Sequence, residues 1–427
     1  MSPAKLLTVF AFSLILSGCS FLTGGQPENI TLKYWGTWDS ATVMNQIRQD
    51  YKLIKPYVDI EYQKQPQQQY RETIEARSQT GDGPDVFQFH NTWTPMLVRE
   101  LAPIPESVIS QSEFQGNYFQ TVFTDLRNSQ KEFVGAPMGV DGLGLYWNED
   151  LFQAAGVLTP PATWQELAQT AARLTVKDRA GNIRTAGIAL GTSSNVDHFS
   201  DILGLMVLQN GGDLRRPTDQ QSADALDYYV HFAKGEDRVW DEAMPSSTIA
   251  FHSGSLAMYL GPSWRAAEIK RENPQLKFKV APVPQLTDGS VAWASYWAVG
   301  VSSKIKDKDK QKEAFEFLKY LQKDETLIKL YSESAKTPGR LIGMPYPKKE
   351  LAKKLASDPI SGAYVTFAPF MHSFPMASNT FDNGLNDQII AAYKEAVDEA
   401  FKRTSSEKAL ETVAQKVAEI FRNIGSL

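Results

Sequence analysis

The feature that most constrains the fold is an alternation of strand-like and helix-like segments near the start of the chain. Residues 30–35 (ITLKYW), 58–63 (VDIEYQ) and 84–89 (PDVFQF) have the short apolar or alternating pattern of strands. The stretches between them, 40–54 and 70–83, read as helices. Strand, helix, strand, helix, strand is the order of a parallel sheet with helices on its faces, so the sequence predicts an α/β fold here.

A second α/β region follows residues 139–144, which hold three glycines and permit unusual backbone angles where the chain leaves the first region. Thr163 and Glu166 have the spacing of a capping box, which predicts a helix beginning at Trp164. A chain of 427 residues exceeds the usual size of one domain, so two domains are expected. No glycine-rich phosphate-binding fingerprint follows a predicted strand, and no cofactor is predicted.

The first residues indicate export. Lys5 precedes an eleven-residue apolar run over 6–16, which is too short to span a bilayer and is typical of a secretory signal peptide over 1–18. The run ends in Leu-Ser-Gly-Cys, which resembles a bacterial lipobox and implies cleavage before Cys19 and diacylation of its thiol, with palmitate as a typical acyl group. The alternative is a plain signal peptide with a cysteine by chance. With the lipid, residues 19–28 form a tether that anchors the protein to the membrane, facing the periplasm or the cell exterior.

Composition excludes some classes of function. Cys19 is the only cysteine, so no internal disulfide is predicted. The net charge of −5 offers no basic surface for nucleic acid. With 9 Trp, 16 Tyr and 22 Phe the chain is rich in aromatic residues, which suits either a large buried surface or one that faces carbohydrate.

Several motifs together resemble the extracellular solute-binding proteins of sugar ABC importers, the maltose-binding-protein-like family. Their order and spacing behind a lipobox make the set more specific than any one of them. They are GPDVF at 83–87, GVDGLGLYWNEDLF at 139–152, GSLAMYLGPSW at 254–264, WAVGVSSKI at 297–305 and TPGR at 337–340.

The resemblance implies a two-lobe periplasmic-binding-protein fold of type II, in which each lobe is a mostly parallel sheet flanked by helices. The ligand would lie in a cleft between the lobes, which close around it by hinge motion. We expect a monomer. The implied limits are 29–138 with 294–337 for lobe one, 142–286 with 342–427 for lobe two, and hinge crossings near 139–141, 287–293 and 338–341.

Ligand-binding residues are expected at the carboxyl ends of the strands. Trp38 and Asp39 directly follow the first strand. An indole face can pack on the C–H groups of a sugar, and a carboxylate can accept from its hydroxyls. The alternative is that Trp38 packs under the next helix while Asp39 caps it. Trp35, inside the strand, is expected in the core.

The end of the third strand offers His90, Asn91 and Trp93 as further candidates. Trp93 serves either as a platform for the ligand or as packing against Pro95 and Met96. His90 has no cysteine or carboxylate partner at the spacing of metal ligands, so no metal site is predicted.

The remaining candidates come from the resemblance. Asp141 at the first crossing either binds the solute or fixes the hinge turn. Trp264, in a turn that follows a strand, is the strongest single candidate, and Arg265 beside it either bonds a hydroxyl or complements a nearby helix. One of Trp293, Tyr296 and Trp297 is expected to line the site. Other implied contacts are His198, Phe199, Asn379 and Phe381.

The sequence therefore predicts a binding protein without catalytic activity. It would capture a carbohydrate, an oligosaccharide by preference, and deliver it to the permease subunits of an ABC importer. A protein of the same fold for another solute, such as a polyamine, peptide or metal chelate, is the first alternative. The second is a secreted glycoside hydrolase, for which Asp39 and Asp141 would have to serve as the carboxylate pair, although no motif marks them as one.

Overall fold

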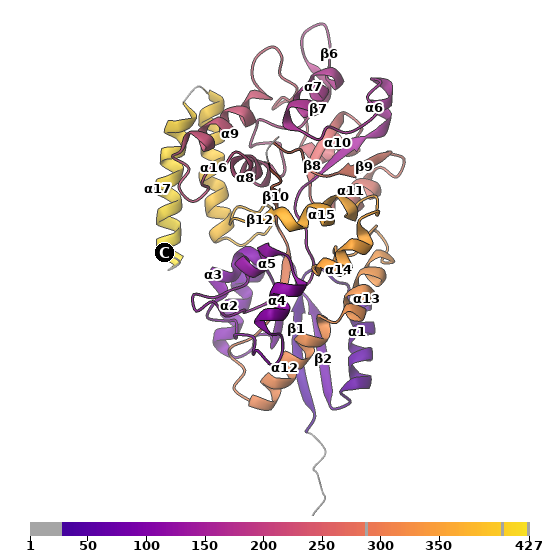
Figure 1. The fold of residues 1–427 in the computed structure, drawn as a ribbon, viewed down its shortest axis with the longest axis vertical. Coiled ribbons are helices and arrows are strands. Elements are labelled where there is room, and N and C mark those ends of the chain that lie inside the picture. Colours follow the sequence, from indigo (N-terminus) through magenta and orange to yellow (C-terminus); the bar gives the residue numbers. More distant parts are fainter. Residues whose placement is uncertain (1–27, 287–288, 403–404, 425–427) are drawn as a thin grey trace, which may run out of the picture.

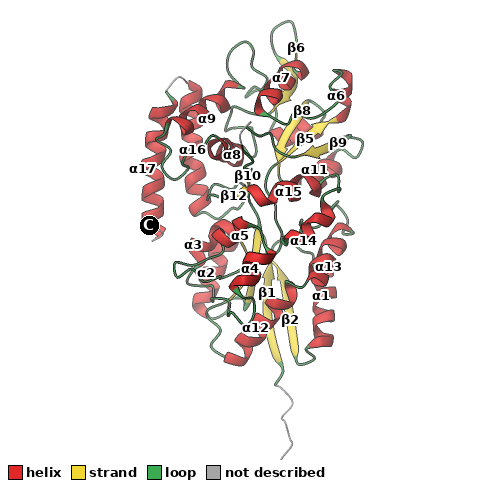
Figure 2. Cartoon of the chain, in the orientation of Figure 1, coloured by secondary structure: helices red, strands yellow, loops and turns green. Residues whose placement is uncertain are grey.

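A computed structural model describes residues 28–286, 289–402 and 405–424 of the chain. Two lobes follow one another along the long axis of the molecule, and each contains a five-stranded sheet with helices around it (Figures 1 and 2). The expected signal peptide, Cys19, nearly all of the tether 19–28 and the first two residues of the crossing 287–293 lie outside the described residues. Within those residues, no helix has both the length and the apolar character that a membrane span requires.

The sheet of lobe one has the strand order β2-β1-β3-β11-β4. The predicted parallel unit is confirmed, because β1 pairs in parallel with both β2 and β3. By contrast, β11 runs antiparallel to β3 and β4. The strands are β1 (Ile30–Gly36), β2 (Val58–Lys64), β3 (Val86–His90), β4 (Ala136–Pro137) and β11 (Trp297–Val301).

Among the described residues, lobe one contains eight helical segments. The helix α1 begins after Ser40, whose side chain accepts a hydrogen bond from the backbone N–H of Val43, so Ser40 rather than Asp39 is the N-cap. The segments are α1 (Ala41–Ile54), α2 (Tyr70–Thr80), η1 (Asn91–Trp93), α3 (Thr94–Leu97), α4 (Gln111–Asn117), α5 (Gln120–Asp125), α12 (Lys308–Leu321) and α13 (Asp324–Ala335).

The sheet of lobe two has the order β6-β7-β8-β5-β9, and only β7 and β8 pair in parallel. The expectation of a mostly parallel sheet is therefore wrong for this lobe. The reason is the position of the crossings. Strand β5 starts where the chain enters the lobe, whereas β8 and β9 end there, as the pairs Gly144 with Gly261 and Leu145 with Ala281 show. The strands are β5 (Gly144–Asn148), β6 (Val176–Lys177), β7 (Ile183–Ile188), β8 (Leu256–Gly261) and β9 (Phe278–Ala281).

Helices cover this second sheet and extend to the C-terminal end of the described chain. The predicted capping box of Thr163 and Glu166 is present at the start of α7. Two long helices, α16 and α17, pack side by side along the left of the molecule (Figure 1). The helices are α6 (Glu149–Ala154), α7 (Trp164–Leu174), α8 (Phe199–Gln209), α9 (Gln220–His231), α10 (Ser247–His252), α11 (Arg265–Glu272), α16 (Leu385–Lys402) and α17 (Ser406–Ile424).

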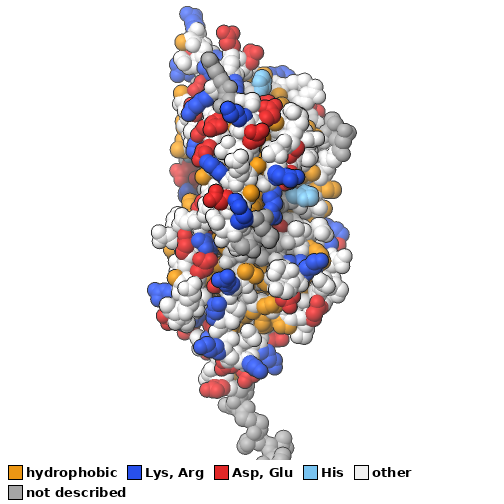
Figure 3. All heavy atoms as spheres, turned by 90° about the vertical axis from the view of Figure 1, so that its left-hand side faces the viewer, with side chains coloured by type: hydrophobic (Ala, Val, Ile, Leu, Met, Phe, Trp, Pro, Cys, Tyr) orange, Lys and Arg blue, Asp and Glu red, His pale blue; other side chains and the backbone are white. Residues whose placement is uncertain are grey.

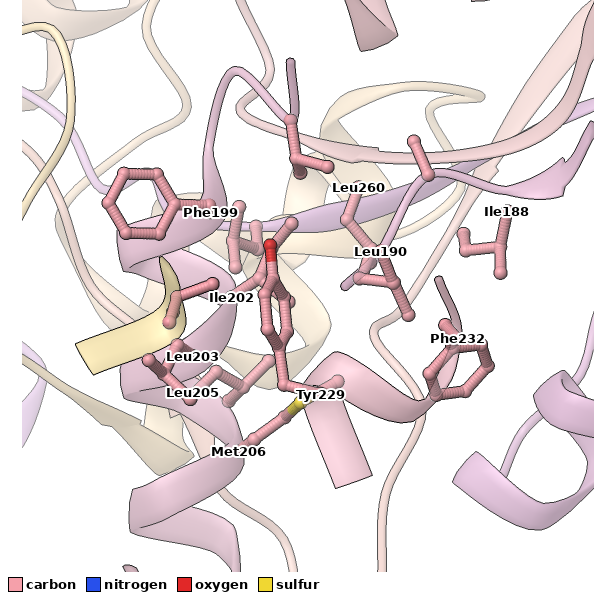
Figure 4. Packing of buried hydrophobic residues seen from close by; sticks show 14 of the residues in the cluster. Ile188, Leu190, Phe199, Ile202, Leu203, Leu205, Met206, Tyr229, Phe232 and Leu260 are labelled. Atoms are coloured by element: carbon pink, nitrogen blue, oxygen red, sulfur yellow. The ribbon is translucent and has the colours of Figure 1, made fainter. Parts of the chain in front are cut away.

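Each lobe has its own apolar core. Trp35 is buried in the core of lobe one, as predicted. In lobe two, Tyr229 of α9 lies among side chains of α8 and the sheet (Figure 4), and its hydroxyl donates to the carbonyl oxygen of Thr192 at 2.8 Å. Phe199 of α8 belongs to this second core.

The stretch from residue 346 to 372, which the expected limits assign to lobe two, contacts both lobes. Leu351 and Val365 belong to the core of lobe one, whereas the Tyr364 hydroxyl donates to Gly261 of lobe two at 2.9 Å. The exact limits of the lobes stay a prediction. The elements of this stretch are α14 (Lys349–Ala352), η2 (Lys353–Leu355), α15 (Ser361–Phe367), η3 (Ala368–Phe370) and β12 (Met371–His372), which pairs in parallel with β10 (Ala292–Trp293).

The backbones of two crossings touch at Gly142. This residue forms a β-bridge with Ala294, and a Cβ atom added to it would lie 1.8 Å from the carbonyl oxygen of Trp293. No side chain can be accommodated at that distance. Glycine at 142 is thus a condition for the close approach of the two crossings.

Gly142→Ala should lower the free energy of unfolding by about 1–3 kcal/mol, because the added methyl group forces two buried backbones apart. Gly116 in α4 is the matched control, since an added Cβ meets nothing within 4 Å. Gly116→Ala should leave stability unchanged or raise it by up to about 1 kcal/mol, because alanine favours the helix. Urea denaturation of the two variants measures both effects. Equal stability of the two would contradict the role of Gly142.

Candidate functional site

A cavity of about 390 Å³ lies between the lobes at the ends of the strands. That volume is within the range of small-molecule sites, about 300–1,000 Å³. Residues from both lobes and from the crossings line it. They are Trp38, Gln67, Gln68, His90, Gly139, Val140, Asp141, Trp264, Arg265, Ser295, Tyr296, Trp297, Met344, Ser378, Asn379, Thr380 and Phe381.

Trp38 forms the wall of the cavity on lobe one. It follows β1, and its ring is partly exposed. The guanidinium of Arg340, from the third expected crossing, lies over the indole at 3.9 Å from the ring centroid and donates to the carbonyl oxygen of Trp38. A cation over one face of the ring fixes its orientation while part of the ring still lines the cavity.

Trp264 occupies the corresponding position on lobe two. It lies in the turn that joins β8 to α11, and the Tyr146 hydroxyl holds this turn by donating to the carbonyl oxygen of Pro262 at 2.6 Å. The guanidinium of Arg265 lies over the Trp264 ring, at 4.4 Å from its centroid. Both candidate platforms are thus braced by an arginine.

Trp297, the first residue of β11, completes the aromatic wall. Its ring meets Trp93 edge-on at 5.3 Å and His90 edge-on at 5.6 Å. Trp93 is fully buried behind it. Of the candidates Trp293, Tyr296 and Trp297, the last two line the cavity, whereas Trp293 is fully buried in the core and donates to Asp201 at 2.8 Å.

Asp141 joins the first crossing to the turn that carries Trp264. Its carboxylate accepts from the Ser263 hydroxyl at 2.7 Å, the Ser263 backbone N–H at 3.1 Å and the Gly142 backbone N–H at 2.8 Å. Burial raises the pKa of Asp141 to about 7, although these hydrogen bonds favour the charged form. Asp141 therefore fixes the turn, which was the alternative role, and also lines the cavity.

Several predicted contacts lie behind the cavity wall. Asn91 is buried, with its amide donating to Asp125 at 2.9 Å. Asp39 is also buried and accepts from the Ser334 hydroxyl at 3.0 Å, and burial raises its pKa. The candidates that do not line the cavity are Asp39, Asn91, Trp93, His198, Phe199 and Trp293, and those that do are Trp38, His90, Asp141, Trp264, Arg265, Tyr296, Trp297, Asn379 and Phe381.

Phe381 reaches the cavity from a loop with unusual backbone angles. Asn379, Phe381 and Asn383 have positive φ angles of 59°, 52° and 45°. The carboxylate of Asp382, fully buried, accepts from the backbone N–H groups of Gly384, Asn386 and Asp387 at 2.9–3.2 Å. These hydrogen bonds hold the loop in its strained conformation.

The sequence did not single out several residues of the wall. Gln67 and Gln68 belong to a glutamine-rich segment that carries no periodic pattern, so only its polarity was informative. Ser295 precedes the predicted Tyr296 and Ser378 precedes the predicted Asn379, but a serine in a loop carries no distinctive signal. Met344 and Thr380 were also missed, because a single methionine or threonine in a loop carries no distinctive signal either.

No metal site is evident in the part of the chain that the structure describes, since no group of three or more His, Cys, Asp or Glu side chains is arranged to hold an ion. The polar groups of the wall can form hydrogen bonds with a solute. The wall offers amides, hydroxyls, one carboxylate and one guanidinium beside three indole rings.

Asp141→Asn tests the raised pKa. The folded chain holds the proton of Asp141 up to a pH of about 7, whereas an ordinary aspartate loses it near pH 3.8, so this source of stability is lost as the pH rises between those values. Asparagine does not titrate. The free energy of unfolding of the variant, relative to wild type, should rise across this window by on the order of 1 kcal/mol per pH unit and level off above it.

Chemical denaturation at intervals from pH 4 to pH 8 makes this measurement. His90, whose pKa burial lowers to about 4, is present in both proteins, so its effect cancels in the difference. A difference that does not change with pH would show that Asp141 ionises normally in the folded chain.

Comparison with known proteins places this geometry in a family. The sn-glycerol-3-phosphate-binding periplasmic protein UgpB of Salmonella typhimurium is 25% identical over 358 residues, which cover 74% of this chain and 76% of that one. A solute-binding protein of an ABC transporter from Thermotoga lettingae, solved with α-D-tagatose, superposes with a TM-score of 0.67 at 20% identity, covering 92% of this chain and 99% of that one. The cyclic α-maltosyl-1,6-maltose binding protein of Arthrobacter globiformis gives a TM-score of 0.72 at 19% identity, with 92% and 99% covered.

The structural relatives show that the two-lobe fold is shared with solute-binding proteins. The family model for bacterial extracellular solute-binding proteins matches residues 39–327. This match includes the strands and crossings that form most of the cavity wall, from Asp141 to Trp297. Because it spans more than half of the chain, the protein belongs to the family of bacterial extracellular solute-binding proteins.

Proposed function

We propose that this protein binds an uncharged carbohydrate in the cavity between its lobes and delivers it to the permease of an ABC importer. The observation that carries the proposal is the pairing of Trp38 and Trp264, which reach one cavity from different lobes. A sugar ring has apolar C–H faces and a polar rim. Indole rings suit the faces, while the hydroxyls and amides of the wall suit the rim.

Contact with both lobes couples binding to closure. A solute that touches Trp38 and Trp264 together binds the closed arrangement more tightly than the open one. The population therefore shifts toward the closed form as the solute binds. This provides the signal by which a permease would distinguish a loaded from an empty binding protein.

The charges of the wall favour an uncharged solute. Arg265 is the one lysine or arginine among the lining residues that the structure describes, and its guanidinium already bonds Glu268 at 2.5 Å and His198 at 3.0 Å. Because the Glu268 carboxylate already balances the charge of Arg265, an anion such as a phosphate ester would meet no uncompensated positive charge in this wall. Asp141 is the only carboxylate of the same set, and donors already surround it.

A glycoside hydrolase would need a second carboxylate facing the same bond. Asp39, the partner that the sequence suggested for Asp141, is buried behind the wall with Ser334. The geometry therefore supports binding and gives no support to the hydrolase alternative.

A thermal-shift screen of the purified protein tests the class of solute. The panel contains α-D-tagatose, mannobiose and maltotetraose, with sn-glycerol 3-phosphate and spermidine as charged alternatives. We expect at least one saccharide to raise the melting temperature, because a ligand of the native state stabilises it. A shift from a charged compound alone would refute the proposal.

Substitution of the tryptophans separates binding from folding. With the saccharide that the screen identifies, Trp38→Ala and Trp264→Ala should each weaken binding by about tenfold or more, which corresponds to about 1.4 kcal/mol. Trp35→Ala is the matched control, since Trp35 lies buried in the core. It should lower the free energy of unfolding by about 3–5 kcal/mol while affinity of the folded fraction is retained. Calorimetric titration and urea denaturation measure the two quantities, and the reverse order would exclude Trp38 from the site.

We further propose that Cys19 carries a lipid that holds the protein at the outer face of the membrane. A thioether-linked diacyl group should bring the wild-type protein into the membrane fraction of bacterial cells. Cys19→Ala should move it to the fraction that contains exported proteins without a lipid. Mass spectrometry of the N-terminal peptide identifies the modification, and an unmodified Cys19 thiol in the exported protein would contradict it.

A further inference from the structure

Two histidine–serine pairs border the cavity, one on each lobe. His90 Nε2 lies 3.1 Å from Ser295 Oγ, and His198 Nδ1 lies 2.6 Å from Ser378 Oγ. Both histidines are buried, and both serines line the cavity. A neutral imidazole has one nitrogen that donates and one that accepts. The tautomer of each histidine thus decides whether its serine gives or receives the hydrogen bond.

The tautomer of His90 follows from a chain of hydrogen bonds whose start is fixed by backbone. The N–H of Ala377 donates to Asn386 Oδ1 at 3.1 Å, which turns the amide nitrogen of Asn386 toward Asp382 at 2.7 Å and Thr92 Oγ1 at 2.8 Å. Thr92 Oγ1 accepts from Asn386 and keeps its own hydrogen for His90 Nδ1, which lies 2.8 Å away. The Thr92 backbone N–H points to the same nitrogen at 3.4 Å. Nδ1 is therefore the acceptor, and Nε2 carries the hydrogen.

His198 has the opposite tautomer. Arg265 Nε donates to His198 Nε2 at 3.0 Å, and a guanidinium has no acceptor. Nε2 must then hold the lone pair, so the hydrogen is on Nδ1. The nearby carboxylate of Asp201, 3.8 Å from Nδ1, favours the same arrangement, and the donor is directed to Ser378.

In both pairs the serine oxygen accepts from the histidine, which leaves its own hydrogen to the cavity. We propose that Ser295 and Ser378 are fixed hydrogen-bond donors to the bound solute, and that His90 and His198 position them through opposite neutral tautomers. The inference rests on the proposed function and names residues that determine specificity. A solute must then offer a lone pair to each serine.

This requirement selects among classes of solute. The hydroxyl, ring and glycosidic oxygens of a saccharide all supply lone pairs. The ammonium groups of a polyamine have none, and they would meet two O–H donors and the Arg265 guanidinium. The two pairs thus disfavour polyamines by unpaired donors as well as by charge.

The same geometry opposes a serine nucleophile. Activation of the Ser295 hydroxyl would require a lone pair of His90 directed at it. That lone pair lies on Nδ1, where the hydroxyl and the backbone N–H of Thr92 occupy it. The pair is arranged to orient a donor.

The tautomers can be measured without any solute. The chain has five histidines, and long-range ¹H–¹⁵N correlation spectra of the ¹⁵N-labelled protein at pH 7 distinguish the two neutral forms and the cation. His90→Gln and His198→Gln identify the two sets of signals. We expect His90 with its hydrogen on Nε2 and His198 with its hydrogen on Nδ1. Either histidine in the other tautomer, or charged, would overturn the proposal.

Thr92→Val tests whether Thr92 determines which nitrogen of His90 carries the hydrogen. The valine keeps the volume and removes the hydroxyl donor to Nδ1, which leaves only the longer backbone N–H contact at 3.4 Å, so a second tautomer of His90 should become populated. Thr94→Val is the matched control, since Thr94 is equally buried and its hydroxyl donates to Asn91 at 3.0 Å, outside the chain of bonds. A single unchanged tautomer in both variants would overturn the role of Thr92.

Affinity tests the donors themselves. For α-D-tagatose, mannobiose or maltotetraose, whichever binds, Ser295→Ala and Ser378→Ala should each weaken binding by about threefold to tenfold, the effect of one lost hydrogen bond. The exposed Ser129→Ala should leave affinity unchanged. Unchanged affinity in both cavity variants would overturn the donor role. If no saccharide binds at all, the proposed function fails, and the tautomers measured without solute still decide whether the pairs exist.

Discussion

The arrangement of the two lobes depends on one backbone contact between the two chain segments that cross from one sheet to the other. At Gly142 there is room for no side chain, because the carbonyl oxygen of Trp293 occupies the place of a Cβ atom. This contact brings the first and second crossings together in one narrow connection. Strands that enter from it run against those that end at it, which accounts for the mixed direction of both sheets. The loops at the strand ends then face each other across the cavity, as ligand sites of open α/β sheets do.

Sequence reasoning succeeded where local chemistry determines local structure. The first three strands, the capping box at Thr163 and the buried Trp35 were all predicted from spacing and residue type. Sequence reasoning was less successful for side chains in the turn that follows a strand. After β3, the short helix η1 turns Trp93 beneath Trp297, and no periodic pattern shows on which side of such a turn a ring will lie. Asp39 shows the same limit, since its partner Ser334 is 295 residues away.

The two histidines illustrate how a buried polar network specifies a binding site. A neutral histidine can point a neighbouring hydroxyl either way, and the choice is made here by groups that can only donate. A backbone N–H sets it on one side, and a guanidinium sets it on the other. Ordering these groups costs free energy during folding, but every member then has its partner. As the proposed donors, the serines would meet the solute already oriented, so binding would lose less rotational entropy.

The loop that carries Phe381 presents a side chain to the cavity at a cost in stability. A phenylalanine with φ of 52° is held at a cost of about 1 kcal/mol or more, which a glycine at the same position would avoid. The ring is retained at the cavity because Asp382, fixed by backbone donors and tied through its carbonyl oxygen to Arg71 of lobe one, secures the chain on its C-terminal side. The frame of the loop is therefore independent of the side chain it displays. Under the proposed function, exchange of that side chain would alter which solute fits while leaving the architecture beneath it intact, so recognition could diversify here without a new fold.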